Sequence, residues 1–306
     1  YNFRTYQSDR LLLVRPGTFE LGGIGNNVFE LISSVGIAKA TGRTLLLPSE
    51  IYEKINMQHP ELVNILDGIY PEEKGTIRSA HHIDRRNSDC CRYDHNIINS
   101  IDYPRKSVFA ADLNYLQSYL YFLSLSRSEI LSRLELGSQV QSAVQREISS
   151  SLSDYDNILC VHSRRGDFLT SRVQTATNAT FLLDATNYLF HAQKTNSSLV
   201  LLIGDDIKWQ KSIEETLRDK GINVQVLPRF KSSSPVVDWH VSRTYCDSVL
   251  LTASSSTFGW WLAYLSKGQR VFYNSEFSTN SKLLDQFQSS HFFPSSWIAL
   301  DRSLFK

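Results

Sequence analysis

Two adjacent arginines and a histidine stand at the end of an apolar run in NILCVHSRRGDF, residues 157–168. The stretch opens like a buried strand, and His162, Arg164, Arg165 and Asp167 follow directly. Because arginine is rarely fully buried without an anionic partner, either carboxylates of the chain or an anionic ligand must meet these guanidinium groups. Two guanidinium groups hold a diphosphate well, through charge-assisted and bidentate hydrogen bonds.

The two arginines are not expected to be equivalent. Successive residues of an extended chain point to opposite sides. One of Arg164 and Arg165 is therefore expected to face a ligand, while the other braces the loop against Asp167. The alternative is an internal ion-pair network that binds no ligand.

A glycine-rich segment, GGIGNN at residues 22–27, connects an expected strand to an expected helix. Glycines let the backbone approach a ligand closely, and the amino end of a helix favours an anion. Gly23, Gly25 and Asn26 are therefore candidate binding residues. The pattern is not GxGxxG, and a tight turn explains it equally well.

A third polar cluster, SSSTF at residues 254–258, places hydroxyl groups at the start of an expected helix. Hydroxyls and the free N–H groups at the start of a helix can form an uncharged phosphate-binding site. Ordinary capping of the helix by a serine or threonine is the alternative interpretation. Trp260 and Trp261 are expected to be packing residues. Since ligands of parallel α/β sheets bind beyond the carboxyl ends of strands, all three clusters are expected to line one cleft.

Metal sites are not favoured by the sequence. Asp205 and Asp206 end a strand without the D-x-D arrangement that many metal-dependent enzymes use, so we expect them to cap the next helix. The chain has four cysteines: Cys90, Cys91, Cys160 and Cys246. Zinc sites usually space their cysteines by two to four residues, so we favour disulfides or thiols and leave the pairing open.

Strands and helices are expected to alternate along most of the chain. Apolar runs predict strands at residues 11–14, 44–47, 157–161, 199–203, 223–227, 249–251 and 271–273. Helices are expected from Asn26 or Asn27 to Gly42, over 112–153 with a break near Ser126, from 180, over 208–220 and 238–245, and from 257. The alternation predicts parallel sheets covered on both faces. A composition change near residues 150–157 suggests two domains, 1–153 and 154–306, while residues 50–110 are difficult to assign.

Composition narrows the classes of function. The chain has 306 residues, 42% of them hydrophobic, and a net charge of +1, so the basic excess of a nucleic-acid binder is missing. No apolar run approaches the length of a membrane span. The sequence begins without a Met or a signal peptide, and we expect it to be a soluble portion of a longer protein. Sequons at Asn178 and Asn196 favour a secretory compartment and N-glycosylation.

Four motifs carry a resemblance to a known family. GGIGNNVFE with TGRTLLLP, HSRRGDF, IGDDIKW and SSSTFGWWLAYL are similar, in order and placement, to motifs of the α-1,2-fucosyltransferases, glycosyltransferase family 11. The resemblance implies a GT-B fold, in which two Rossmann-like domains face each other across a cleft. It implies GDP-fucose as donor, inversion at the anomeric carbon, no required metal or other cofactor, and an acceptor-side N-terminal domain opposite a donor-binding C-terminal domain. It also implies the Golgi lumen, with a membrane anchor outside this sequence, as in a type II membrane protein.

The resemblance also implies roles for single residues. Arg165, or else Arg164, would hold the β-phosphate, and Asp238 would read guanine or ribose. Further donor-binding residues would be His162, Gly23, Gly25, Asn26, Ser255, Ser256, Thr257 and Phe258. Asp167 and Glu20 are candidate proton acceptors for a glycan hydroxyl, expected to be O2 of a galactose. A protein O-fucosyltransferase and a non-catalytic carbohydrate-binding protein are the alternatives.

Three mild departures from the family pattern are Ser163, Asn27 and Phe168. The region from His59 to Arg105 matches no motif of the family, and acceptor choice is expected to reside there.

Overall fold

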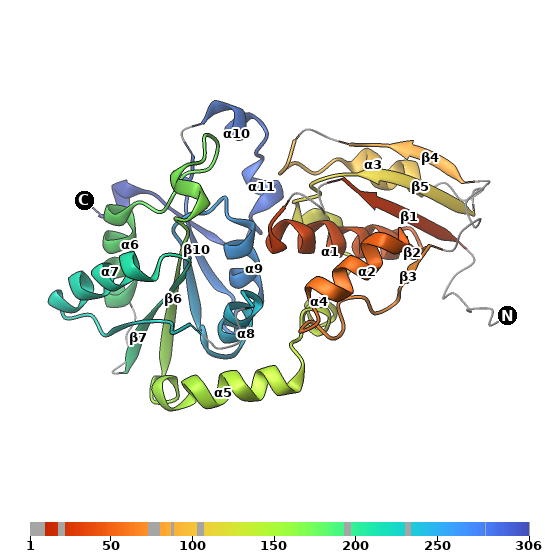
Figure 1. The fold of residues 1–306 in the computed structure, drawn as a ribbon. Helices are drawn as coiled ribbons and strands as arrows, with labels where there is room; N and C mark the ends of the chain where they lie inside the picture. The colour runs from red at the N-terminus through yellow and green to blue at the C-terminus, as the bar shows by residue number, and fades with distance from the viewer. Residues whose placement is uncertain are drawn as a thin grey trace. The chain divides into compact units, whose positions relative to one another are not determined.

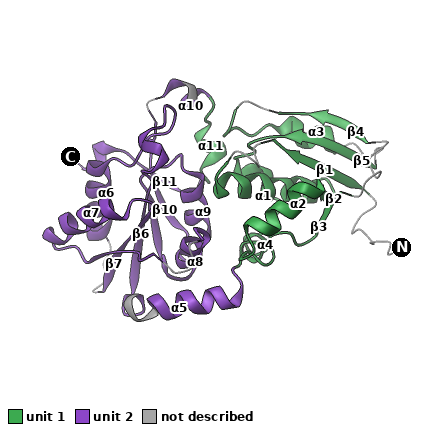
Figure 2. Cartoon of the chain, viewed as in Figure 1, with its two compact units in different colours: residues 1–135, 286–294 green, residues 136–285, 295–306 purple. Residues whose placement is uncertain are grey.

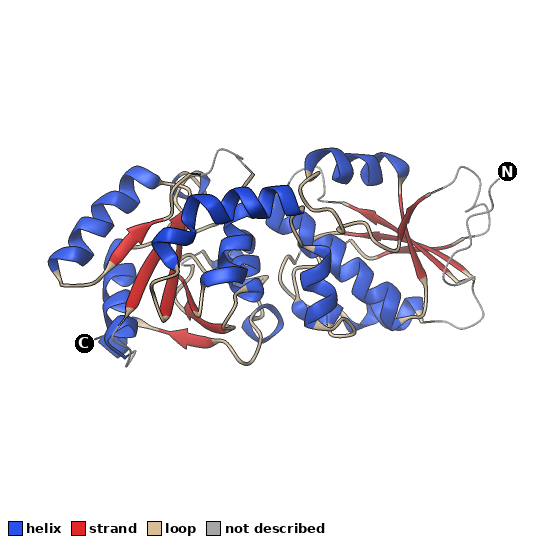
Figure 3. Ribbon diagram, turned by 90° about the horizontal axis from the view of Figure 1, so that it is seen from below, coloured by secondary structure: helices blue, strands red, loops and turns tan. Residues whose placement is uncertain are grey.

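The computed structural model describes residues 10–17, 22–72, 80–86, 89–102, 107–192, 197–229, 234–278 and 280–305 (Figure 1). The chain forms two compact units (Figure 2). Unit 1 consists of residues 1–135 and 286–294, and unit 2 of residues 136–285 and 295–306. In each unit, helices lie on both sides of a parallel sheet (Figure 3).

Unit 1 is built on a five-stranded sheet in the order β3-β2-β1-β5-β4. Its strands are β1 (Leu11–Pro16), β2 (Thr44–Leu47), β3 (Ile69–Pro71), β4 (His81–Asp84) and β5 (Val108–Leu113), and all pairs are parallel. Its helices are α1 (Ile24–Ala40), α2 (Ser49–Gln58), α3 (His95–Ile101), the 3-10 helix η1 (Tyr119–Phe122), α4 (Arg127–Arg133) and α11 (Ser289–Phe292).

Helix α1 is the central helix of unit 1, and most of its side chains are buried. The η1 segment lies directly on it at Gly36, where an added Cβ would stand 2.5 Å from the Cα of Phe122. The ring of Phe29 contacts the rings of Phe122 and Phe292, at centroid distances of 6.3 and 5.9 Å. Residues of η1 and α11, which are far apart in the sequence, therefore complete the core around α1.

Unit 2 is built on a six-stranded sheet in the order β11-β10-β9-β6-β7-β8. Its strands are β6 (Asn157–Ser163), β7 (Ser198–Gly204), β8 (Val224–Val226), β9 (Ser248–Leu251), β10 (Arg270–Asn274) and β11 (Ile298–Leu300), again all parallel. Its helices are α5 (Ser138–Leu152), α6 (Ala179–Ala192), α7 (Ile207–Asp219), α8 (Val236–Tyr245), α9 (Thr257–Leu265) and α10 (Ser281–Asp285), with the short 3-10 helices η2 (Asp167–Leu169) and η3 (Arg302–Phe305).

Strand β6 lies in the interior of this sheet, between β7 and β9, and both of its faces are buried. Leu159 and Val161 belong to the core cluster that contains residues of α6 and α7. Cys160 and His162 alternate with them and therefore face the opposite side, where α8 and α9 lie. The disulfide between Cys160 and Cys246, the residue that ends α8, joins strand and helix on that side.

The structure confirms the predicted strands and most of the predicted helices of unit 2. Two predictions are corrected, and the predicted break near Ser126 is confirmed. Helix α1 begins at Ile24, and its N-cap residue is Gly23 rather than Asn26 or Asn27. No side-chain hydrogen bond therefore caps the start of α1. The region predicted as helical from residue 112 begins inside β5. Ser126 is the break between helical segments, because its side chain and Glu129 form a capping box at the start of α4.

The compact units divide at residue 135, whereas the sequence suggested a junction at 153. Helix α5 accounts for the difference, because it packs on α8 of unit 2, and the hydroxyl of Tyr245 donates to Oε1 of Gln145 at 2.8 Å. A second disulfide joins the adjacent Cys90 and Cys91. Among the described residues, no helix has the length and apolarity needed to span a bilayer.

Candidate functional site

The candidate site of unit 2 is a pocket at the carboxyl ends of β6 and β7. Segments after β8 and at the starts of α8 and α9 complete its wall. The lining residues are His162, Ser163, Arg164, Gly204, Asp205, Arg229, Pro235, Asp238 and Phe258. The pocket thus lies where parallel α/β sheets bind their ligands.

Of the adjacent arginines, Arg164 and Arg165, Arg164 is the one that lines the pocket. Its Nη2 lies 2.7 Å from Oδ1 of Asp167, and its Nη1 lies 3.2 Å from Oδ2 of Asp205. Its backbone N–H donates to the hydroxyl of Thr177 at 2.9 Å. These contacts hold the guanidinium at the pocket while about a third of the side chain stays exposed.

Arg165 points to the other side, as the alternation of the extended chain predicts. Its Nε lies 3.2 Å from Oδ2 of Asp206, and its guanidinium lies over the ring of Trp209 at 4.5 Å. Both partners belong to the start of α7, so Arg165 braces that helix and does not line the pocket.

The two arginine side chains point in opposite directions, as the sequence predicted, and which of them binds a ligand stays a prediction. The sequence slightly favoured Arg165 as the ligand-side residue, whereas the structure places Arg164 at the pocket. Asp167 was expected to pair with the bracing arginine, and in the structure it pairs with Arg164, the arginine at the pocket.

His162 is buried beneath the start of α9, where only a glycine fits. A Cβ added to Gly259 would stand 2.5 Å from Nδ1 of the imidazole. Burial, and secondarily the charge of Arg164, lower the pKa of His162 to about 3. The imidazole is therefore neutral near pH 7, and its buried Nδ1 has no hydrogen-bond partner among the described residues.

Asp238 and Arg229 place opposite charges on the pocket wall. Burial raises the pKa of Asp238 to about 7, although the positive charge of Arg229 opposes the shift. Nη2 of Arg229 also donates to the carbonyls of Gly204 and Asp205, at 3.2 Å each. Arg229 therefore ties the segment after β8 to the end of β7.

Asp205 and Asp206 have separate structural roles. Oδ1 of Asp206 accepts from the backbone N–H of Trp209 at 3.0 Å, which confirms its predicted capping of α7. Asp205 does not cap; its Oδ1 accepts from the N–H of Arg165 at 2.9 Å, and its Oδ2 pairs with Arg164. In the described part of the chain, no group of His, Cys, Asp and Glu side chains has the arrangement of a metal site.

In the serine cluster at the start of α9, Ser256 caps the helix, whereas Ser255 has a hydroxyl without a described partner. Ser256 is the N-cap residue, and its Oγ accepts from the N–H of Gly259 at 3.3 Å. The buried Oγ of Ser255 has no hydrogen-bond partner within the described ranges. Of the four predicted donor-binding residues here, Phe258 lines the pocket, and Ser255, Ser256 and Thr257 do not.

Of the remaining predicted site residues, some lie in unit 1, some outside the described ranges, and Asn178 lies on the surface of unit 2. Gly23, Gly25 and Asn26 form the start of α1, after the carboxyl end of β1, where the N–H of Asn26 donates to the carbonyl of Gly23 at 2.9 Å. Glu20 and Asn196 fall outside the described residues. The sequon residue Asn178 is exposed, and its Oδ1 accepts from the N–H of Phe181 at 2.9 Å.

Sequence reasoning missed Arg229 and Thr177. Arg229 follows a three-residue strand in a polar stretch that resembles no motif. The sequence signal that could have indicated Arg229 was the position of this residue just beyond the carboxyl end of a predicted strand. Thr177 gave no signal, because its contact with the backbone of Arg164 depends on how the intervening loop folds back.

The two units, each built on a parallel sheet with helices on both sides, give this chain the GT-B fold. The Bradyrhizobium fucosyltransferase NodZ has a similar fold. The crystal structure of NodZ α-1,6-fucosyltransferase soaked with GDP-fucose superposes with a TM-score of 0.52 at 15% identity, covering 89% of this chain and 97% of that one.

The sequence pattern of Glycosyl transferase family 11 matches residues 78–301, and the chain belongs to this family. A galactoside 2-alpha-L-fucosyltransferase of Caenorhabditis elegans is 28% identical over 286 residues, which span 92% of this chain and 78% of that protein. The galactoside 2-alpha-L-fucosyltransferase SEC1 of Bos taurus is 26% identical over 305 residues, spanning 95% and 76%. The protein is thus a glycosyltransferase similar to the α-1,2-fucosyltransferases, as the motifs implied.

Proposed function

We propose that the protein transfers L-fucose from GDP-fucose to a glycan, at O2 of a galactose, with inversion at the anomeric carbon. Membership of family 11 and the galactoside 2-alpha-L-fucosyltransferases among its relatives support this assignment. The observation that carries the assignment is the pocket in which the Arg164 guanidinium, the neutral His162 and the Asp238 carboxyl come together.

The pocket residues fit the parts of a nucleoside diphosphate. In our proposal, Arg164 binds the diphosphate by charge-assisted hydrogen bonds, since it is the described arginine held at the pocket by two carboxylates. Asp238 accepts hydrogen bonds from guanine or ribose. Nδ1 of His162, a pocket residue, has no hydrogen-bond partner among the described residues, and in our proposal it meets a polar group of the donor.

Transfer exchanges one bond of the anomeric carbon for another. The bond from fucose C1 to the phosphate oxygen breaks, and its electron pair leaves with GDP. An acceptor oxygen forms the new bond from the opposite face and loses its proton. Negative charge grows on the diphosphate as the first bond breaks, so a guanidinium fixed beside it stabilises the transition state more than the ground state.

The remaining role to assign is that of the group that accepts the proton of the acceptor hydroxyl. Asp167 is two-thirds exposed, and its carboxylate is bound by Arg164 at 2.7 Å. To accept a proton it would have to weaken this ion pair, so we assign Asp167 to positioning Arg164. Glu20, the other carboxylate that the sequence offered, or a water molecule would then receive the proton.

The deciding experiment is transfer to defined glycans. The protein is incubated with GDP-fucose and a glycan array, and the linkage of any added deoxyhexose is determined by methylation analysis. We expect fucose at O2 of terminal galactose. Fucose on serine or threonine of a folded small domain would instead identify a protein O-fucosyltransferase. GDP-fucose binding without transfer to any acceptor would identify a non-catalytic carbohydrate-binding protein.

We also propose that the protein acts in the Golgi lumen, as the soluble part of a type II membrane glycoprotein. The sequon at the exposed Asn178 and two disulfides support a secretory compartment. Expression in secretory cells followed by peptide-N-glycosidase treatment tests this: an unchanged mass would oppose it.

A further inference from the structure

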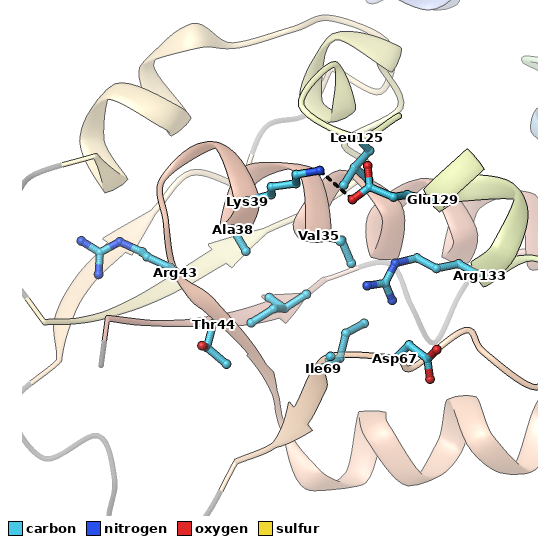
Figure 4. Close-up of a pocket in the computed structure, with 12 residues that line it drawn as sticks. Val35, Ala38, Lys39, Arg43, Thr44, Asp67, Ile69, Leu125, Glu129 and Arg133 are labelled. Atoms are coloured by element: carbon cyan, nitrogen blue, oxygen red, sulfur yellow. Dashed lines mark hydrogen bonds and ion pairs between the residues drawn. The ribbon is translucent and has the colours of Figure 1, made fainter. Parts of the chain in front are cut away.

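Unit 1 contains a second cavity, of about 420 Å³, at the opposite end of α1 from the glycine-rich segment. Its walls come from the end of α1, the start of β2, the residues before β3, and α4 with the turn before it (Figure 4). Because an α-helix rises about 1.5 Å per residue, the two ends of α1 are separated by roughly 25 Å. The cavity is therefore distinct from any site at the start of α1.

The floor of this cavity is apolar. Val35, Ala38, Leu45, Ile69 and Leu125 line it, and each has less than a tenth of its surface exposed. Contact with these side chains would remove apolar surface of a ligand from water, which is favourable. The floor thus suits the hydrocarbon part of a small molecule.

Two of the three basic residues of the cavity are already engaged. Nζ of Lys39 lies 2.6 Å from Oε1 of Glu129, so their charges largely cancel. The side chain of Arg43 points away from the cavity centre in Figure 4, and its guanidinium donates to the carbonyls of Ile101 and Ser107.

Arg133 is the third basic residue, and it is placed differently. It is the last residue of α4, and its guanidinium points into the cavity, between Val35 and Ile69 (Figure 4). Its Nη1 is buried and has no hydrogen-bond partner in the described chain. Burial lowers the pKa of Arg133, while Asp67 and Glu129 oppose the shift. A buried N–H without an acceptor costs free energy, which an acceptor supplied by a ligand would recover.

We propose that this cavity is a second ligand site, which binds a small monocarboxylate with its hydrocarbon part on the apolar floor and its carboxylate on Arg133. The planar guanidinium matches a carboxylate in a bidentate arrangement. A single charge suits the site better than a phosphate dianion, because Asp67 and Glu129 stand nearby. The site does not depend on the proposed transfer function, since none of its residues lines the pocket of unit 2.

The test measures binding of hexanoate and benzoate to the whole protein by calorimetry and ligand-observed NMR, with hexanol, benzyl alcohol and inorganic phosphate as comparison ligands. We expect each acid to bind about tenfold more tightly than its alcohol, and phosphate more weakly than the acids. Arg133→Met is expected to lower acid affinity to that of the alcohols and to leave alcohol affinity unchanged.

Two further variants separate the site from general effects. Arg127→Met, on the same helix but outside the cavity lining, should bind the acids like the unaltered protein. Arg133→Lys keeps the charge, loses the fork and should bind them with intermediate affinity. Because no described group accepts from Nη1, Arg133→Met should also melt near the native temperature. The proposal would be overturned if an acid and its alcohol bound with equal affinity, or if acid binding survived Arg133→Met. Absence of acid binding at about 10 mM acid would also overturn it.

Discussion

Replacing Arg164 with lysine is expected to lower kcat by about 10²–10³ while changing stability little. Lysine keeps the positive charge but has one ammonium group, which cannot reach Asp167, Asp205 and a phosphate oxygen together. Loss of one preorganised donor to a transition-state anion costs about 2.7–4 kcal/mol. The partly exposed ion pairs are worth only about 0.2–1 kcal/mol each, so the catalytic effect should exceed the effect on stability.

Arg165→Lys is the matched control. It alters the contacts with Asp206 and Trp209, neither of which lines the pocket. A cation–π contact and an exposed ion pair together are worth about 1–2 kcal/mol, so this variant should melt at a lower temperature and keep kcat within about tenfold.

The assay compares kcat and KM for GDP-fucose, calorimetric GDP affinity and melting temperature for both variants. GDP affinity should fall less than kcat for Arg164→Lys, because the phosphate charge is greatest in the transition state. Native turnover in Arg164→Lys with a hundredfold loss in Arg165→Lys would refute the structural assignment and restore the order that the sequence favoured. Native turnover in both would refute the diphosphate role itself.

Five other outcomes are expected. GDP affinity should fall by up to about tenfold per pH unit below pH 7, because protonation of Asp238, whose pKa is raised to about 7, removes an acceptor; a flat calorimetric profile from pH 5 to 8 would contradict this. The same raised pKa should make the free energy of unfolding decrease as pH rises from about 4 to 7, and Asp238→Asn should remove this decrease in urea titrations. Arg229→Gln should weaken GDP-fucose binding by about tenfold and move the loss of binding to higher pH, since Arg229 lowers the pKa of Asp238; an unmoved midpoint would exclude this coupling. Replacing Cys160 and Cys246 by serine should lower the free energy of unfolding, measured in urea titrations, by about 2–5 kcal/mol. EDTA should leave turnover unchanged, because in our proposal the guanidinium of Arg164, rather than a metal ion, meets the diphosphate.

The sequence predicted the unit 2 sheet well because its buried parallel strands are continuous apolar runs between amphipathic helices. It predicted opposite directions for Arg164 and Arg165 because the pleat alone requires them. It could not decide which arginine faces the pocket, because that depends on whether α7 or α8 and α9 cover a given face of β6. Arg229 was missed for a similar reason, since its contacts with Gly204 and Asp205 join segments of separate strands.

Unit 1 was harder to predict because its strands are short and partly exposed. β4 has the sequence HHID, in which only Ile83 is buried, so no apolar run marks it. α11 was not predicted, because its four residues are too few for a periodic pattern, and their burial depends on contact with α1.

Residues 286–294 have a consequence for how the chain acquires its structure during synthesis. Phe292 packs on Phe29, and the carbonyl of His291 accepts from the hydroxyl of Ser118, so unit 1 includes a segment made after nearly all of unit 2. Domains emerging from the ribosome usually fold in order from the N-terminus. Here the core of the first unit is completed only after residues 286–294 have been made, because until then Phe292 does not cover Phe29. A fragment that ends at residue 135 would therefore lack part of its own core, whereas a fusion of residues 286–294 to that fragment would restore it.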